Sequence, residues 1–338
     1  MTVLVTGGAG YIGAHVVRLL QQRGDDVAVL DDFSTGPASR VPDVPVLRMD
    51  LADGGSVTTL SKGLAEHAVS SVIHIAAKKQ VGESAVRPAW YYSQNVGGTA
   101  NLLQAMEDAG VRRLMFSSSA ATYGMPDVAP GAVLDEAALP NPISPYGQTK
   151  LVGEWMIAAA GRAWGLRSVS LRYFNVAGAG WDDLGDPGVF NLIPIALAQL
   201  THGGQPKVFG RDYPTPDGTC IRDYVHVLDL AEAHLRALDY LDRDARPYDT
   251  FNVGTGEGAS VDEVLTAIGR ATGYDIAPEA VERRPGDPPA LVADVTRIAD
   301  TLGWRPSRGL PEIVASAWAA WPSAHGTPAT PLQRRRKG

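Results

Sequence analysis

The chain has 338 residues, of which 45% are hydrophobic and 20% are charged, a composition typical of globular proteins. Its length predicts one large domain or two modest ones and excludes a small disulfide-stapled scaffold, and its composition argues against a disordered chain. The formal net charge of −7 argues against a general nucleic-acid binder, because such proteins need a basic surface to displace counterions from phosphates.

Short β-branched runs alternate with longer helical patterns in the first half of the chain, as in βαβ units around a parallel sheet. We expect helices over Tyr11–Arg23, which Gly24 is placed to end, over about Val96–Ala109 and over about Ser144–Trp164. The pattern predicts an α/β fold with a doubly wound parallel-sheet Rossmann domain. The expected strands are Val3–Thr6, Val27–Leu30, Val46–Arg48, Ser71–Ile75, Arg113–Ser117 and Arg167–Arg172.

Beyond Arg172 the sequence becomes loop-like and rich in Gly, Pro and Asp, which predicts a second, smaller C-terminal lobe. There we expect helices over Tyr224–Leu241 and Val261–Thr272, a strand over Phe251–Val253 and a solvated loop over Trp181–Asp186. We interpret the terminal run LQRRRKG as a solvated basic end.

A glycine-rich turn joins the first expected strand to the first expected helix. Gly7, Gly10 and Gly13 follow at intervals of three residues, the context in which backbone N–H groups approach a pyrophosphate at a helix N-terminus. Asp31 closes the second strand, where an acidic residue binds the adenosine ribose hydroxyls. A carboxylate there repels a 2′-phosphate, so Asp31 followed by Asp32 favours NAD over NADP. A turn or helix cap is the alternative interpretation.

A tyrosine and a lysine four residues apart form a second chemical motif. Tyr146 and Lys150 share one face of a helix, and Ser117 to Ser119 end a strand earlier in the chain. A phenol with an ordinary pKa near 10 is a poor base, but a neighbouring ammonium and a positively charged nicotinamide ring would both lower that pKa. Ser119 can hydrogen-bond the same reacting oxygen. The alternative is an ordinary exposed pair on a helix.

Several sequence motifs together resemble those of a known protein family. TGGAGYIG, SSSAATYG and YGQTK resemble the extended branch of the short-chain dehydrogenase/reductase family. Longer words resemble the UDP-glucose 4-epimerase family, in order and spacing over essentially the whole chain; they are KKQVGES (Lys78–Ser84), NVGGT (Asn95–Thr99), LRYFNVAGA (Leu171–Ala179), DYPTPDGTCIRDYVHV (Asp212–Val227) and RRPGDPPALVAD (Arg283–Asp294). The resemblance implies an NAD-binding Rossmann domain over 1–175 and a UDP-sugar-binding domain over 176–338, with segments near 221–254 returning to the first domain.

The resemblance also implies roles for individual residues. Tyr146 matches the catalytic base, Lys150 the partner that lowers its pKa and binds the ribose, and Ser119 the hydroxyl that assists proton transfer. NAD is expected to contact Gly7, Gly10, Tyr11, Ile12, Gly13, Asp31, Asp32, Phe33, Ser34, Thr35, Gly36, Asp50, Leu51, Ile75, Ala76, Ala77, Lys79, Asn95, Ser117, Tyr146, Lys150, Tyr173 and Phe174. The UDP-sugar is expected to contact Lys79, Ser119, Tyr146, Asn175, Asn191, Leu192, Val208, Phe209, Arg222, Arg284, Asp287 and Leu291.

The implied reaction interconverts UDP-galactose and UDP-glucose without net redox. The Tyr146 phenolate takes the proton of the sugar 4-hydroxyl while the C4 hydride passes to NAD, the 4-keto sugar turns, and the hydride returns to the opposite face. NAD is expected to stay bound through the cycle. The family resemblance further suggests a homodimer built on the helices near Val96–Ala109 and Ser144–Trp164.

Two departures from the family pattern bear on the sugar. The threonine of the common serine-alanine-threonine-valine-tyrosine word is displaced by one place, to Thr122, and Ala121 stands before it. Leu291 is intermediate in bulk where the family carries tyrosine or a smaller residue, so we expect the plain sugar pair to be preferred over the N-acetylated pair. The UDP-N-acetylglucosamine/UDP-N-acetylgalactosamine 4-epimerase reaction remains an alternative.

Two further functions stay open as alternatives. A sugar-nucleotide 4,6-dehydratase needs an additional acid and base beside the strand-end serine, where this chain has Ala120 and Ala121. A dinucleotide-sensing regulator could discard the Tyr146 and Lys150 pair, which this chain keeps.

The remaining candidates receive structural interpretations. Cys220 is expected to be a small packed side chain and His74 a hydrogen-bonded structural histidine. No His, Cys or Asp cluster has metal-ligand spacing. A lone cysteine, no basic leader and no long apolar run predict a cytoplasmic protein with no membrane contact.

Overall fold

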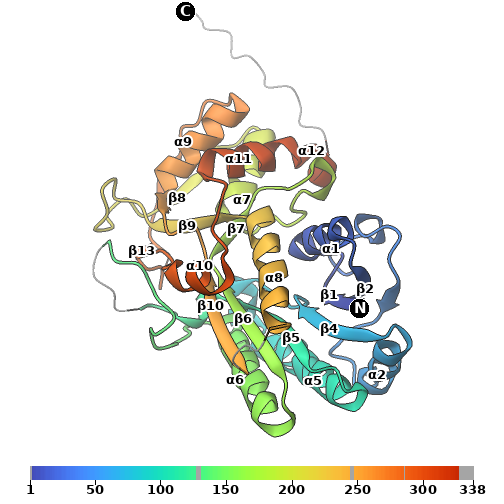
Figure 1. Ribbon diagram of the computed structural model, residues 1–338. Coiled ribbons are helices and arrows are strands. Elements are labelled where there is room, and N and C mark those ends of the chain that lie inside the picture. The colour runs from blue at the N-terminus through green and yellow to red at the C-terminus, as the bar shows by residue number, and fades with distance from the viewer. Residues whose placement is uncertain (1, 127–130, 244–246, 285, 327–338) are drawn as a thin grey trace, which may run out of the picture.

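The computed structural model describes residues 2–126, 131–243, 247–284 and 286–326, and the terminal run LQRRRKG lies outside these ranges. Two lobes are present, a larger one around a seven-stranded sheet and a smaller one above it in Figure 1. The large sheet has the order β10-β6-β5-β4-β1-β2-β3, and every neighbouring pair is parallel. Its strands are β1 Thr2–Thr6, β2 Asp26–Asp31, β3 Val46–Arg48, β4 Val69–His74, β5 Arg113–Ser119, β6 Arg167–Tyr173 and β10 Tyr248–Val253.

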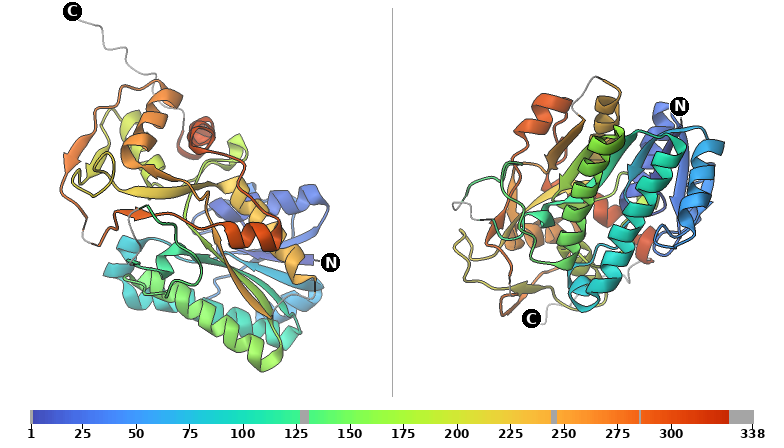
Figure 2. Two further views of the ribbon diagram at one scale, coloured as in Figure 1. Left: turned by 60° about the vertical axis from the view of Figure 1, so that its left-hand side comes forward. Right: turned by 90° about the horizontal axis from the view of Figure 1, so that it is seen from below.

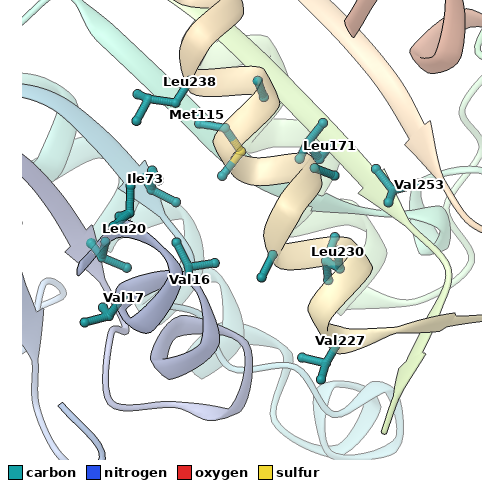
Figure 3. Packing of buried hydrophobic residues seen from close by; sticks show 14 of the residues in the cluster. Val16, Val17, Leu20, Ile73, Met115, Leu171, Val227, Leu230, Leu238 and Val253 are labelled. Atoms are coloured by element: carbon teal, nitrogen blue, oxygen red, sulfur yellow. The ribbon is translucent and has the colours of Figure 1, made fainter. Parts of the chain in front are cut away.

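Helices cover both faces of this sheet. They are α1 Tyr11–Arg23, α8 Val227–Leu241 and α10 Thr296–Leu302 on one face, and α2 Ser56–Glu66, α5 Gly98–Ala109 and α6 Pro145–Trp164 on the other. Side chains alternate along each strand, so Val3 and Val5 of β1 lie in the first core and Leu4 lies in the second. Figure 3 shows Leu20 of α1 and Leu230 of α8 in the first core, and Figure 2 shows α5 and α6 side by side over the second.

Short elements connect these layers. They are the 3-10 turns η1 Ala38–Arg40, η3 Ala120–Thr122 and η4 Asp182–Leu184, the helices α3 Val81–Val86 and α4 Pro88–Tyr91, and the π-helical turn η2 Tyr92–Gly97. The last of these runs directly into α5, so the expected helix near Val96–Ala109 is the regular part of a longer helical segment.

The smaller lobe has its own sheets and core. Its strands are β7 Asn175–Ala177, β8 Lys207–Phe209, β9 Ile221–His226, β11 Gly258–Ser260, β12 Glu279–Val281 and β13 Ala290–Leu291, and its helices are α7 Leu192–Thr201, α9 Val261–Thr272, α11 Leu310–Ala319 and α12 Trp321–His325. β9 pairs with β7, β11 and β13, while β8 pairs with β12. Leu197 of α7, Ile268 of α9 and Ile313 of α11 are buried together in this core.

The structure confirms the predicted fold class, corrects one predicted helix and adds helices that were not predicted. Helices α1 and α9 have their predicted bounds, and Gly24 ends α1 with a left-handed φ of 88°. The prediction of one helix over Tyr224–Leu241 is wrong, because its first residues complete β9 and the ring of His226 then caps α8 by accepting a hydrogen bond from the Leu228 N–H. The helices that were not predicted are α2, α3, α4, α7, α10, α11 and α12. The division of the chain after residue 175 stays a prediction.

Candidate active site

A cavity lies at the carboxyl ends of β1, β2 and β4, where the strand order of the large sheet reverses. Most of the residues predicted to contact the cofactor line it. They are Gly7, Gly10, Tyr11, Ile12, Gly13, Asp31, Asp32, Ser34, Thr35, Asp50, Leu51, Ile75, Ala76, Ala77, Lys79, Asn95, Tyr146, Lys150 and Tyr173.

The glycine turn leaves no room for side chains. Gly7 has a φ of 70°, and a Cβ on it would lie 2.8 Å from the backbone nitrogen of Ala76 on the neighbouring strand end. A Cβ on Gly13 would overlap the Gly7 carbonyl oxygen. Among the described residues, no side chain caps α1 at Gly10, and its first turn has no acidic residue. The turn therefore presents backbone N–H groups at a positive helix end, which fits a dinucleotide pyrophosphate.

Asp31 is fixed at the end of β2 by backbone groups of that turn. Its carboxylate accepts hydrogen bonds from the N–H of Ala9 at 2.9 Å and of Phe33 at 2.8 Å. Burial raises the pKa of Asp31, and these two hydrogen bonds act in the opposite direction. Lys78 lies 3.7 Å from Asp32 and also lines the cavity, although it was not predicted. The carboxylate of Asp31 thus lines the cavity next to the glycine turn.

Tyr146 and Lys150 project from the first two turns of α6, which Ser144 caps by accepting a hydrogen bond from the Gly147 N–H at 3.1 Å. The Lys150 ammonium donates to the Ser117 carbonyl at 2.7 Å. Burial lowers the pKa of Lys150 to about 8. Burial raises the pKa of Tyr146, and a hydrogen bond with Ser119 opposes that rise. The expectation that an ammonium and a positively charged nicotinamide together lower this pKa stays a prediction.

Four residues predicted to contact the cofactor do not line the cavity. A Cβ on Gly36 would overlap the Ala9 carbonyl, so this glycine packs behind the glycine turn. Phe33 packs against the first core and Phe174 is buried with Ala120. Ser117 acts on the site through its carbonyl, while its hydroxyl lies 3.0 Å from a ring nitrogen of His234.

The residues predicted to contact the UDP-sugar form a second group in the smaller lobe. Arg222 and Asp287 form an ion pair, and Arg222 pairs in register with Leu291. The Arg284 guanidinium lies 3.8 Å from the ring centroid of Phe209. Cys220 lies among the charges of both arginines. The charges of Arg222 and Arg284 therefore both lie near the Cys220 thiol in the smaller lobe.

Other members of this second group have different surroundings. Asn175 begins β7, Asn191 is the N-cap residue of α7, and Leu192 begins that helix. The side chain of Val208 is fully buried in the core of the smaller lobe, so only its backbone is available to a ligand.

The displaced threonine does not face the cavity. Thr122 is fully buried, and its hydroxyl donates to the Ser119 carbonyl at 2.8 Å. The Ser119 hydroxyl accepts a hydrogen bond from the Ala121 N–H at 3.1 Å. Thr122 therefore holds the turn that carries Ser119.

A loop of the smaller lobe completes the cavity and was not predicted. Asp186, Pro187, Gly188 and Phe190 line the same cavity as the glycine turn. Arg40 is buried and donates to the carbonyls of Gly185 at 3.0 Å and Leu184 at 3.2 Å. The expectation of a solvated loop over Trp181–Asp186 is wrong at Leu184, which is fully buried. No periodicity in the sequence marks this loop, because its position depends on distant anchors.

Structural interpretations of two other candidates are confirmed. The His74 ring lies within hydrogen-bond distance of the Thr6 hydroxyl, at 2.7 Å, and of the Thr99 hydroxyl, at 3.1 Å. Burial raises the pKa of the partly buried Cys220 thiol, which makes it a poor nucleophile. Among the described residues there is no cluster of metal-ligating side chains, and none of the described helices is long and apolar enough to cross a membrane.

Known proteins resemble the chain over nearly its whole length. The NAD dependent epimerase/dehydratase family matches residues 3–254. A UDP-glucose 4-epimerase of Azospirillum brasilense is 45% identical over 321 residues, which are 93% of this chain and 90% of that protein. The crystal structure of UDP-glucose 4-epimerase from Brucella ovis in complex with NAD is 42% identical with a TM-score of 0.89, covering 96% of this chain and 98% of that one. A UDP-glucose-4-epimerase structure from Stenotrophomonas maltophila, with bound NAD and formylated UDP-arabinopyranose, is 40% identical with a TM-score of 0.88, covering 95% and 97%.

Proposed function

We propose that this chain, which belongs to the NAD-dependent epimerase/dehydratase family, interconverts UDP-galactose and UDP-glucose. It is an enzyme of the isomerase class, and NAD is its cofactor. The observation that carries the proposal is that Tyr146 and Lys150 line the same cavity as the glycine turn. The dehydratase alternative lacks its extra acid and base at Ala120 and Ala121, and a regulator has no need of the Tyr146 and Lys150 pair.

In the proposed reaction the cofactor supplies the hydride transfer and the side chains in the cavity supply the proton transfer. When bound, NAD accepts the hydride from C4 of the sugar and returns it, which no side chain can do. Tyr146 takes the proton of the 4-hydroxyl as its phenolate and gives it back at the end of the cycle. Because burial raises the pKa of this phenol, its ionisation needs positive charge nearby, and the Lys150 ammonium supplies that charge one turn along α6. Ser119 orients the phenol through its hydrogen bond.

The nucleotide and the sugar are held differently in this proposal. Arg222 and Arg284 bind the diphosphate, and Asp287 keeps the first of these guanidinium groups in place through its ion pair. This proposal places these two cations on the diphosphate and not on the sugar ring. The ring is therefore free to turn about its link to the diphosphate and to present its opposite face.

We further propose that Leu291 favours the plain sugars over the N-acetylated ones. Leu291 is half-buried and packs against the cluster of Ala120, Tyr123 and Phe174 beneath the strand-end serine. Substituting Leu291→Tyr should lower any activity on UDP-N-acetylgalactosamine and leave activity on UDP-galactose within a few fold. Unchanged activity on the N-acetylated substrate would contradict this role.

A homodimer through the α5 and α6 face is also proposed. These helices lie side by side on the outside of the large lobe (Figure 2), and the Trp155 side chain on α6 is 62% exposed there. Burying such an aromatic surface stabilises an interface. Trp155→Glu should convert the protein to a monomer in sedimentation experiments, and a wild type that sediments as a monomer would contradict the proposal.

We also propose that the protein acts in the cytoplasm, because its single cysteine, Cys220, suits a reducing compartment.

The test of the function uses the purified protein and UDP-galactose with no added NAD. Formation of UDP-glucose supports both the reaction and the retention of NAD during purification. No product after NAD is supplied would refute the proposed reaction.

A further inference from the structure

Three ionisable side chains lie one turn apart on the buried face of α6. Tyr146, Lys150 and Glu154 follow at intervals of four residues, and each is less than a tenth exposed. Tyr146 and Lys150 line the cavity, whereas Glu154 lies behind them and does not. The reaction proposed above uses the first two residues and gives Glu154 no role.

Glu154 is bound by side chains from two strands of the large sheet, β5 and β6. Its Oε1 accepts a hydrogen bond from the Ser118 hydroxyl at 2.5 Å and from Nε of Arg172 at 2.9 Å, and its Oε2 accepts from Nη2 of Arg172 at 2.6 Å. Both members of this ion pair are buried, with 3% and 7% of their side chains exposed. Because a packed apolar pair of similar volume is often at least as stable, stability alone gives no reason for a carboxylate here.

The Lys150 ammonium has few sources of negative charge around it. It donates to the Ser117 carbonyl and lies 5.1 Å from the ring centroid of Phe116. Among the described residues, Glu154 is the carboxylate whose charge acts on Lys150, and Arg172 is bound to the far side of that carboxylate. The other titratable groups nearby are held in their uncharged forms by burial; they are His74, Tyr146 and Tyr173.

We propose that Glu154 is a positioning residue that keeps the buried Lys150 ammonium charged, so that the Tyr146 phenol beside it can lose its proton. The proposal rests on the function proposed above. It assigns the reacting proton to Tyr146, the supporting charge to Lys150 and the maintenance of that charge to Glu154. It also explains why a costly buried ion pair lies one turn behind the cavity.

The ionisation of Lys150 gives the size of the effect. Burial lowers the pKa of Lys150 to about 8, and Glu154 is the group that raises it. Without that carboxylate the pKa of Lys150 falls further, so a larger share of the amine is uncharged at neutral pH. Tyr146 then ionises beside a neutral amine, at a higher pH than in the wild type.

The experiment measures the ionisation of Tyr146 directly. The tyrosinate absorbance of the NAD-loaded protein is followed against pH, and the same titration of a Tyr146→Phe version of each protein is subtracted. In Glu154→Gln the midpoint should rise by about one pH unit and kcat at neutral pH should fall about tenfold, with KM for UDP-galactose nearly unchanged. Glu154→Asp keeps the charge and should keep the wild-type midpoint.

Two control variants separate this role from a loss of stability. Asp229→Asn removes another fully buried carboxylate that binds an arginine, Arg308, but lies on α8, so it should lower stability without moving the Tyr146 midpoint. If Glu154→Gln does not fold because Arg172 is left unpaired, the double variant Glu154→Gln/Arg172→Gln removes both charges and should show the same upward shift.

The outcomes distinguish this proposal from the proposed function. An unchanged Tyr146 midpoint in the variants that lack the carboxylate, together with wild-type turnover of UDP-galactose, overturns the role of Glu154 and leaves the function standing. A raised midpoint in a protein that does not turn over UDP-galactose keeps the role of Glu154 and refutes the sugar assignment.

Discussion

Substituting Gly7→Ala tests whether the glycine turn is a cofactor cradle. At a φ of 70° an alanine is strained by about 1–2 kcal/mol. Its Cβ would also lie 2.8 Å and 2.9 Å from the backbone nitrogen and Cα of Ala76, which cannot swing aside as a side chain does. Such overpacking costs about 1–3 kcal/mol, and the turn must shift to relieve it.

The shift displaces the N–H groups that face the pyrophosphate, so the overpacking part of the cost appears as lost affinity for NAD. A loss of about 1–3 kcal/mol corresponds to a dissociation constant raised about 5- to 150-fold. The assay is calorimetric titration of NAD into protein from which the bound cofactor has been removed. Thermal unfolding of the same samples measures the accompanying loss of stability.

Gly24→Ala is the matched control. Gly24 ends α1 at a φ of 88°, with no atom within 4 Å of an added Cβ. It therefore carries the same backbone strain without the clash, and it should lose stability while keeping its NAD affinity. If Gly7→Ala binds NAD as tightly as Gly24→Ala does, the turn is not the pyrophosphate site and the reasoning fails.

Three further predictions address the base, the loop and the buried histidines. Tyr146→Phe should lower kcat about 10²- to 10⁴-fold while NAD stays bound, as measured by turnover and cofactor content. Arg40→Met should speed NAD release at least several fold in a stopped-flow exchange experiment, because Arg40 anchors the loop that lines the cavity. Stability should fall as the pH drops below about 6.5, by up to about 2 kcal/mol per histidine at pH 5, measured by chemical unfolding. The histidines concerned have pKa values that burial lowers to about 3 or 4; they are His15, His74, His226 and His234.

The sign of the pH effect follows from these pKa values. Each folded-state pKa lies below the unfolded value, so the unfolded chain binds more protons between about pH 3 and 6.5. The stabilisation is complete above that window and is lost as the pH falls through it. A stability that is constant between pH 7 and pH 5 would contradict the burial of these rings.

The control for Arg40→Met is Arg23→Met. It removes an ion pair between α1 and α8 and should not change the rate of NAD release.

Much of the fold was predictable because its signals are local. The stripe of apolar residues in α1 and the glycine after it fixed both ends of that helix. The start of α8 was not predictable in the same way, because Tyr224 and Val225 suit a helix or a strand and the pairing of β7 with β9 decides between them. Tertiary pairing overrides local preference at such positions.

In the candidate site, too, the residues with a local sequence signal were predictable and those placed by tertiary contacts were not. The glycine turn, Asp31 and the Tyr146 and Lys150 pair belong to sequence motifs in which the spacing of the residues indicates their chemistry. All of them line one cavity. The loop that contains Asp186 lies at the cavity because distant residues such as Arg40 bind its backbone. These contacts have no local sequence signal. The partnership of Glu154 with Arg172 joins α6 to β6 and likewise leaves no signal in the sequence.

The central claim is that one hydride leaves C4 of the sugar and returns to the same carbon. The direct test incubates the enzyme with UDP-galactose that carries deuterium at C4, and measures the label in the UDP-glucose formed. Full retention of deuterium at C4 is the predicted result. Exchange of the label with solvent hydrogen, or its loss from the product, would contradict the account.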